Sequence, residues 1–176
     1  MKKPLVVILM GAIGDAPHCA RIEKALAELG LAFETRVGSA HKTPAHVSSL
    51  LAEYEADGRP RVYITVAGLS NALSGFADGA VNAPVIACPP PSESHGGADL
   101  YSSIRMPGGI APAFVQDPAN AALLAAKILG LCDPEVAAKA AAFRRARAEK
   151  TLADDAAIRM SCAGAFDAGA PDATGP

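Results

Sequence analysis

Short apolar runs alternate with amphipathic stretches along the first 131 residues of the chain. Runs rich in leucine and β-branched residues are typical of strands covered on both faces. They predict strands at 4–10, 32–38, 61–68 and 83–89, with a shorter apolar piece at 111–115. Apolar residues at helical spacing, bounded by Gly or Pro, predict helices at 16–29, 44–54, 70–81 and 118–131. This alternation predicts an α/β fold with a mainly parallel sheet and helices on both faces.

A further helix is predicted at 134–159, beginning at Pro134 and rich in Ala, Arg, Lys and Glu. It follows a complete domain, and its alanines suit close packing on another subunit, although a solvated charged helix is an alternative. Residues 161–176 are low in complexity and are expected to be disordered. The predicted organisation is therefore one domain over 1–160 and a tail.

The composition narrows the class of protein. The chain has 176 residues, 51% of them hydrophobic and 19% charged, with a formal net charge of −2. This balance favours neither nucleic acid nor an anionic membrane as a partner. No apolar run approaches the length of about 18 residues that spans a bilayer. The four cysteines are scattered without metal-site spacing, which indicates unpaired thiols in a reducing cytoplasm.

Polar residues gather where the predicted strands end, in "MGAIGD", "GSAHKTP", "AGLSNALSG" and "CPPPSESHGG". In parallel sheets these ends meet at one edge, where ligands bind. We therefore expect the four segments to lie together at one edge of the sheet. The last of them, rich in Pro, Gly and Ser, is expected to act as a lid.

The first of these segments, "MGAIGD", has two glycines that let the backbone approach a ligand. The following helix would present its N-terminus, which attracts anions. The spacing matches neither a dinucleotide fingerprint nor a P-loop. A tight turn with Asp15 as helix N-cap is the alternative interpretation.

The second segment, "SAHKTP", carries the strongest chemical signal. Near neutral pH, the imidazole of His41 can accept or donate a proton, and Lys42 adds a fixed positive charge for phosphate or carboxylate. Ser39 and Thr43 could bind an anion, and Thr43 is also a plausible N-cap. A capping turn without chemistry is the alternative, whereas His18 and His46 are expected at ordinary helical positions.

Taken in order, the motifs resemble the PurE family, which carboxylates aminoimidazole ribonucleotide (AIR) in purine biosynthesis. The residues that carry the resemblance are "MGAIGD", "SAHKTP", "AGLSNALSG", "CPPPSESHGGADLYSSIRMPGG" and "NAALLAAKILGL", within residues 4–155. Lys42, "SNALSG", "CPPP" and "SSIRMPGG" are similar to class II members, which use AIR and carbon dioxide directly. The implied fold is a three-layer sandwich around a flavodoxin-like or Rossmann-like sheet.

The resemblance implies a carboxy-lyase, an AIR carboxylase that needs no ATP, biotin, metal or other cofactor. By matched position, His41 would shuttle the proton. The expected substrate-binding residues are Gly11, Asp15, Ser39, Lys42, Ser70, Asn71 and Leu73. For Ser70 and Asn71, a helix N-cap is an equally good interpretation. The family assembles as a homo-octamer with sites at subunit junctions, so we expect the final helix to pack on a neighbouring subunit.

Three positions depart from the family pattern. Ala12 and Gly14 replace serines of the first loop, and Leu69 stands where class II members usually have arginine. These changes remove hydroxyls and a charge expected near the sugar-phosphate. Two alternatives to AIR carboxylase follow. One is an N5-carboxyaminoimidazole ribonucleotide mutase, or a related enzyme of another ribonucleotide. The other is a ligand-binding relative without catalysis, against which the retained His41 argues.

Overall fold

A computed structural model describes residues 2–92 and 94–167 of the chain, with the backbone alone for 94, 95 and 162–167. The chain divides into two compact units, Met1–Ala140 and Ala141–Pro176. The first unit contains the sheet and all the segments predicted to form a site.

The first unit is built on a five-stranded parallel sheet with the order β2-β1-β3-β4-β5. The strands are β1 (Leu5–Met10), β2 (Phe33–Val37), β3 (Arg61–Val66), β4 (Val85–Ala87) and β5 (Ala113–Phe114). The predicted parallel α/β architecture is therefore confirmed. Strand β4 is shorter than the predicted 83–89 because Pro84 and Pro89 bracket it, and proline has no N–H for the ladder.

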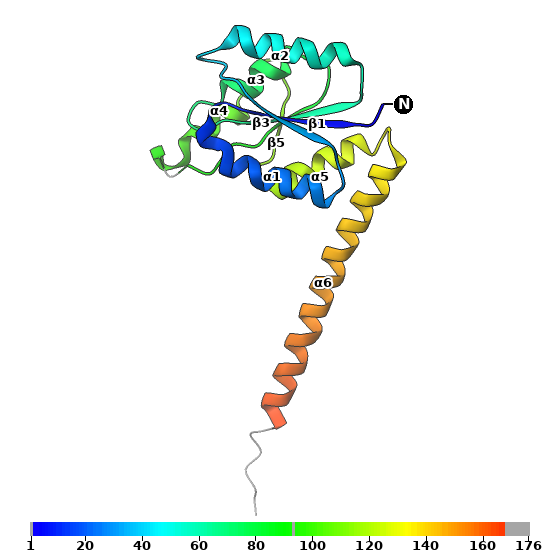
Figure 1. Ribbon diagram of the computed structural model, residues 1–176. Coiled ribbons are helices and arrows are strands. Elements are labelled where there is room, and N and C mark those ends of the chain that lie inside the picture. The colour runs from blue at the N-terminus through cyan, green and yellow to red at the C-terminus, as the bar shows by residue number, and fades with distance from the viewer. Residues whose placement is uncertain (1, 93, 168–176) are drawn as a thin grey trace, which may run out of the picture. The chain divides into compact units, whose positions relative to one another are not determined.

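Helices cover both faces of the sheet, with α1 and α5 on one side and α2 and α3 on the other (Figure 1). The helices of this unit are α1 (Ala16–Glu28), α2 (Pro44–Asp57), α3 (Ala72–Asp78), α4 (Tyr101–Ile104) and α5 (Pro118–Leu129). Two short 3-10 helices, η1 (Ile13–Asp15) and η2 (Ser94–Leu100), precede α1 and α4. Helix α3 is shorter than the predicted 70–81, since Asn71 caps its start and Gly79 its end.

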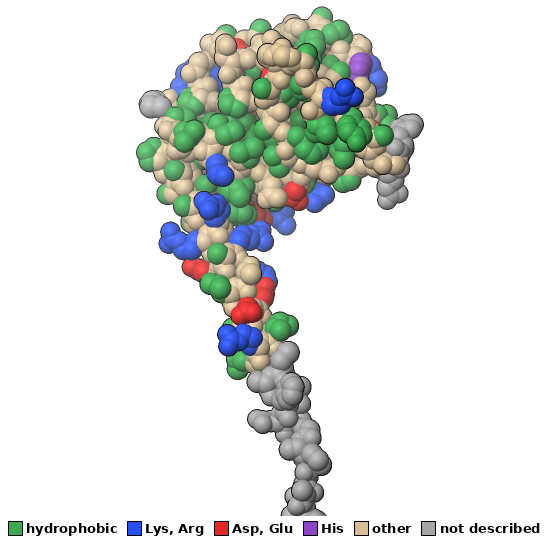
Figure 2. Space-filling model, turned by 180° about the vertical axis from the view of Figure 1, so that it is seen from behind, with side chains coloured by type: hydrophobic (Ala, Val, Ile, Leu, Met, Phe, Trp, Pro, Cys, Tyr) green, Lys and Arg blue, Asp and Glu red, His purple; other side chains and the backbone are tan. Residues whose placement is uncertain are grey.

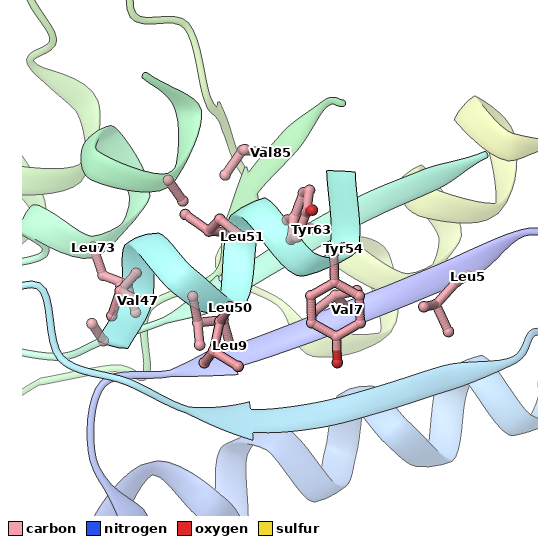
Figure 3. Close-up of a cluster of buried hydrophobic side chains, with 12 residues drawn as sticks. Leu5, Val7, Leu9, Val47, Leu50, Leu51, Tyr54, Tyr63, Leu73 and Val85 are labelled. Atoms are coloured by element: carbon pink, nitrogen blue, oxygen red, sulfur yellow. The ribbon is translucent and has the colours of Figure 1, made fainter. Parts of the chain in front are cut away.

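The core lies on both sides of the central strands. Every residue of β1 and β3 is buried, as expected of strands covered on both faces. Figure 3 shows side chains of β1 and β3 packed against α2, in one cluster with Leu73 of α3 and Val85 of β4. The α2 side chains predicted to face the core are all buried there: Val47, Leu50, Leu51 and Tyr54. This packing fixes the strand ends from which the loops emerge.

The C-terminal helix α6 runs from Pro134 to Asp167 and crosses the boundary between the units. It continues past the predicted end at 159, because the sequence is alanine-rich and the next proline after Pro134 is Pro171. The helix thus includes residues 161–167, and 168–176, the rest of the tail predicted to be disordered, lie outside the described residues. Nearly all described side chains of the second unit are exposed, so packing on a neighbouring subunit stays a prediction. Of the helices described, none is long and apolar enough to cross a bilayer.

Candidate active site

The strand order places a crevice at the carboxyl ends of β1 and β3. From β1 the chain proceeds first to β2 on one side and then to β3 on the other. Loops diverge at such a switch point, and open α/β sheets bind their ligands there. A pocket of about 370 Å³ lies at this position.

Three loops, the 3-10 helix η1 and the helix α3 line this pocket. Its lining residues are Gly11, Ala12, Asp15, Ser39, Ala40, His41, Lys42, Ala67, Gly68, Leu69, Ser70 and Leu73. The structure therefore brings together all the residues predicted for the site except Asn71. It also confirms that the first three polar segments share one edge of the sheet.

Gly11 lets the ends of β1 and β3 lie close together beneath the pocket. Its N–H donates to the carbonyl of Val66 at 2.8 Å. A Cβ at Gly11 would lie 3.3 Å from the Cβ of Ala67, closer than side chains normally pack. The close approach of the two strand ends thus requires a glycine here. The same glycine leaves the floor of the pocket without side-chain bulk.

The loop after β2 closes on itself and holds His41 and Lys42 outward. The Ser39 N–H donates to Thr43 Oγ1 at 3.1 Å, and the Lys42 N–H donates to Ser39 Oγ at 3.2 Å. The Thr43 N–H also donates to the Ser39 carbonyl at 2.9 Å. Thr43 precedes α2, but its side chain does not cap the helix and bonds back to Ser39 instead. Both His41 and Lys42 are exposed in the pocket, where a ligand can reach them.

Asp15 supplies the carboxylate of the pocket. It stands immediately before α1, but its side chain makes no capping hydrogen bond to that helix. Partial burial raises the pKa of Asp15, and a backbone hydrogen bond at Ala12 opposes this effect. Because the carboxylate is not used as a cap, it can accept hydrogen bonds from ligand hydroxyls.

The loop after β3 contains an unusual backbone conformation. Leu69 has a φ of 59°, and among the described residues it is the one non-glycine with a positive φ. Its side chain is 63% exposed at the pocket. The neighbouring Ser70 is exposed too. The loop therefore presents these two side chains through a conformation that L-residues rarely adopt.

Asn71 has a structural position rather than a place in the pocket wall. It is 1% exposed, and its side-chain carbonyl accepts a hydrogen bond from the Ser74 N–H at 3.2 Å. Its amide nitrogen donates to Ser103 Oγ at 3.0 Å. Of the two interpretations that the sequence offers, the geometry favours the N-cap of α3.

The Pro-rich segment, which follows β4, lies against the loop after β3. This agrees with the prediction that these segments share one edge of the sheet. A Cβ at Gly68 would lie 3.5 Å from Pro90 Cγ. From α4, Ser102 and Ser103 hydrogen-bond the backbone and side chain of Asn71. Sequence reasoning assigned no role to these two serines, although the adjacent hydroxyls of "SSIR" were a visible signal. Closure of the segment as a lid stays a prediction.

A buried His–Cys contact connects α1 to the end of β4. His18 Nε2 lies 3.5 Å from Cys88 Sγ. Burial, and then the charge of Arg21, lowers the pKa of His18. Burial raises the pKa of Cys88 and that of Cys19 to about 12. These groups are therefore neutral near pH 7, and both thiols are poor nucleophiles. Within the described part of the chain, no group of three or more His, Cys, Asp or Glu side chains could hold a metal ion.

Comparison with known proteins identifies the family. The family model described as AIR carboxylase matches residues 5–150. The chain belongs to this family. It is 53% identical over 157 residues to the phosphoribosylaminoimidazole carboxylase of Treponema denticola, covering 89% of this chain and 99% of that protein. The corresponding enzyme of Archaeoglobus fulgidus is 44% identical, with 87% of this chain and 84% of the relative covered.

The structural comparison agrees with this membership. A crystal structure of Treponema denticola PurE superimposes with a TM-score of 0.87 at 53% identity, covering 89% of this chain and 99% of that one. A mouse bifunctional phosphoribosylaminoimidazole carboxylase/succinocarboxamide synthetase is 44% identical over 134 residues, which are 76% of this chain and 32% of the mouse protein. The AIR carboxylase family thus accounts for the fold and the ordered motifs of the first unit.

Proposed function

We propose that this protein is a class II phosphoribosylaminoimidazole carboxylase, which joins AIR and carbon dioxide to give 4-carboxyaminoimidazole ribonucleotide in purine biosynthesis. The single observation that carries the proposal is an exposed imidazole, His41, in a pocket at the switch point of the sheet. Asp15 and Lys42 line the same pocket. A family relative with 53% identity carries this enzyme name.

The charges of the pocket suit one orientation of the ribonucleotide. Lys42 attracts the phosphate, and Ser39 Oγ, which accepts one backbone hydrogen bond, retains a hydrogen to donate to it. Asp15 accepts hydrogen bonds from the ribose hydroxyls. Ser70 and Leu73 lie against the base, and Gly11 leaves room for the sugar. The N-terminus of α1, next to Asp15, adds a favourable dipole near the anion.

The reaction needs one base at the imidazole carbon. The C4 of AIR attacks the carbon of CO2, a C–C bond forms, and one C=O π pair moves onto its oxygen, which becomes the anionic oxygen of the carboxylate. The hydrogen left on C4 passes to the neutral imidazole of His41, and the C–H electrons restore the aromatic ring. A base held beside the ring suits this step. Release of that proton to solvent regenerates the enzyme.

The remaining wall of the pocket suits a neutral, apolar co-substrate. Ala40, Ala67, Gly68 and Leu73 contribute small or apolar surfaces next to the polar groups. These surfaces offer CO2 no side-chain hydrogen bonds, so they do not hold it away from the imidazole ring of AIR. Closure of the Pro-rich segment would exclude water while the C–C bond forms and the proton moves to His41, and reopening would let that proton leave.

The assembly and the cellular setting follow from the same proposal. Figure 2 shows hydrophobic side chains gathered over much of one face of the first unit, as expected of a surface that another subunit covers. We expect a homo-oligomer, an octamer as in the family, in which α6 packs on a neighbour. We expect the enzyme to work in the cytoplasm without a bound cofactor.

The test is a turnover assay with AIR and bicarbonate, followed by the absorbance of the carboxylated imidazole. We expect turnover by the wild type and a loss of roughly 10²- to 10⁴-fold in kcat for His41→Asn. The matched control is His46→Asn, because His46 is an exposed histidine of α2 outside the pocket lining. Turnover of N5-carboxyaminoimidazole ribonucleotide, but not of AIR with bicarbonate, would identify a mutase instead.

A further inference from the structure

The loop after β3 holds Leu69 in the left-handed region, with a φ of 59°. For an L-residue with a branched side chain, the Cβ crowds the backbone in this conformation, so it persists only where neighbouring contacts hold it. Leu69 is largely exposed, so its own side chain is not packed tightly enough to supply that restraint. The restraint must come from contacts to its backbone.

One hydroxyl, that of Ser102 in α4, contacts the backbone on both sides of Ser70. Ser102 Oγ lies 3.3 Å from the carbonyl oxygen of Leu69, to which it can donate. Ser102 Oγ also accepts a hydrogen bond from the Asn71 N–H at 2.9 Å. The one hydrogen of this hydroxyl has a nearer acceptor in the carbonyl of Asp99 at 2.7 Å, so the bond from the Asn71 N–H is the stronger of its two contacts to the loop after β3. Ser102 therefore connects the loop after β3 to η2 and α4, which follow the Pro-rich segment.

The helix that carries this hydroxyl is itself anchored. Ser103 Oγ, also in α4, accepts a hydrogen bond from the buried side-chain amide of Asn71. Beyond α4, the segment 106–111 lies against α3, because Gly75 and Gly79 leave space for Met106 and Ile110, respectively. The N–H of Ala111 donates to the Asp78 carboxylate at 2.7 Å, which closes the far end of this contact.

We propose that Ser102 is a positioning residue of the active site: its hydroxyl holds Leu69 in the left-handed conformation and so places Leu69 and Ser70 at the pocket. Ser102 is not among the residues that line the pocket, so it acts through the loop and not on the substrate. The proposal deepens the carboxylase function and rests on it for the kinetic test.

The first test compares Ser102→Ala with Ser102→Thr, which keeps the hydroxyl. We expect kcat/KM for AIR to fall about tenfold in Ser102→Ala and to return to within about threefold of the wild type in Ser102→Thr. The unfolding temperature should change by less than about 4 °C, because the lost hydrogen bonds are offset by relief of strain at Leu69. Ser49→Ala, at an exposed serine of α2, is the matched control and should leave both measurements unchanged. A purely structural role would lower the unfolding temperature and leave kcat/KM unchanged.

The decisive test is a double-mutant cycle with Leu69→Gly. Glycine adopts positive φ without strain, so the loop should keep its conformation with less help from the hydroxyl. We expect Ser102→Ala to lower kcat/KM by less than about threefold in the Leu69→Gly background, compared with about tenfold in the wild type. Equal losses in the two backgrounds would overturn the proposal.

Amide hydrogen exchange tests the same contact without any turnover. The Asn71 N–H donates to Ser102 Oγ, so its exchange should accelerate at least tenfold in Ser102→Ala and recover in Ser102→Thr. A wild type that fails to carboxylate AIR would refute the proposed function, and the exchange result would still decide whether Ser102 holds the loop. Unchanged exchange in Ser102→Ala would overturn the positioning role even in an active enzyme.

Discussion

Substitution of Asn71 by alanine separates two roles that the sequence left open, a substrate ligand or a helix cap. The residue is 1% exposed and both ends of its amide are used. Asn71→Ala removes the acceptor for the Ser74 N–H and the donor to Ser103 Oγ. If Asn71 is structural, the main effect of this substitution is on the free energy of unfolding.

The magnitude follows from these two hydrogen bonds. Loss of an N-cap side chain costs about 1 kcal/mol, with a range of roughly 0.5–2. Ser103 is 2% exposed, and a buried polar group left without its partner costs about 1–3 kcal/mol. Together they predict a loss of about 2–4 kcal/mol, which lowers the unfolding temperature by roughly 4–16 °C in a chain of this size.

The assay is urea unfolding at a fixed protomer concentration, because assembly changes apparent stability. Asn71→Ser is the control, since serine can cap α3 but cannot reach Ser103 in the same way, and it should recover about half of the lost stability. A stability loss below about 1 kcal/mol in Asn71→Ala, together with a large rise in KM, would refute the capping role and restore Asn71 as a substrate ligand.

Three further predictions concern charge and titration. Lys42→Met should raise KM for AIR roughly 10- to 150-fold with little change in kcat, because a charged phosphate contact is lost; initial rates measure this, and an unchanged KM would contradict it. The lowered pKa of His18 means that its contribution to stability is present above the ordinary value of 6.5 and is lost as the pH falls through the folded pKa. Urea unfolding should therefore show that the free energy of unfolding falls less on acidification in His18→Gln than in the wild type. An identical pH dependence in the two proteins would contradict this. Iodoacetamide at pH 8 should alkylate the exposed Cys132 and spare Cys19 and Cys88 until the protein is denatured, as peptide mass mapping can show; early labelling of the buried pair would contradict their burial.

The sheet was predictable because its signal is local in the chain. The apolar runs at 4–10 and 61–68 are long enough to indicate strands buried on both faces, and the structure buries β1 and β3 completely. The edge of the sheet that holds the pocket followed from topology, since parallel strands end together. The sequence alone therefore placed His41 and Lys42 at the edge where the pocket lies, and their roles stay a prediction.

The contacts between loops were not predictable, because they join residues far apart in the chain. The Asn71 N–H meets Ser102 Oγ across 31 residues, and no periodicity reports such a pairing. The hydrogen bond from the Thr43 hydroxyl to the Ser39 carbonyl was not predicted either. A Thr before Pro44 is typical of an N-cap, and the sequence does not show which acceptor its hydroxyl chooses. A positive φ at Leu69 has no sequence signal, because glycine is the residue that normally marks it.

The exposure of the pocket side chains has an evolutionary consequence. His41, Lys42 and Leu69 are all exposed on loops, while the strands beneath them are buried in a separate core. Replacement of Lys42 creates no cavity and leaves no buried partner unpaired, so selection can retune substrate preference at this position without first acquiring compensating mutations. This scaffold can thus diverge in specificity at little risk to its integrity.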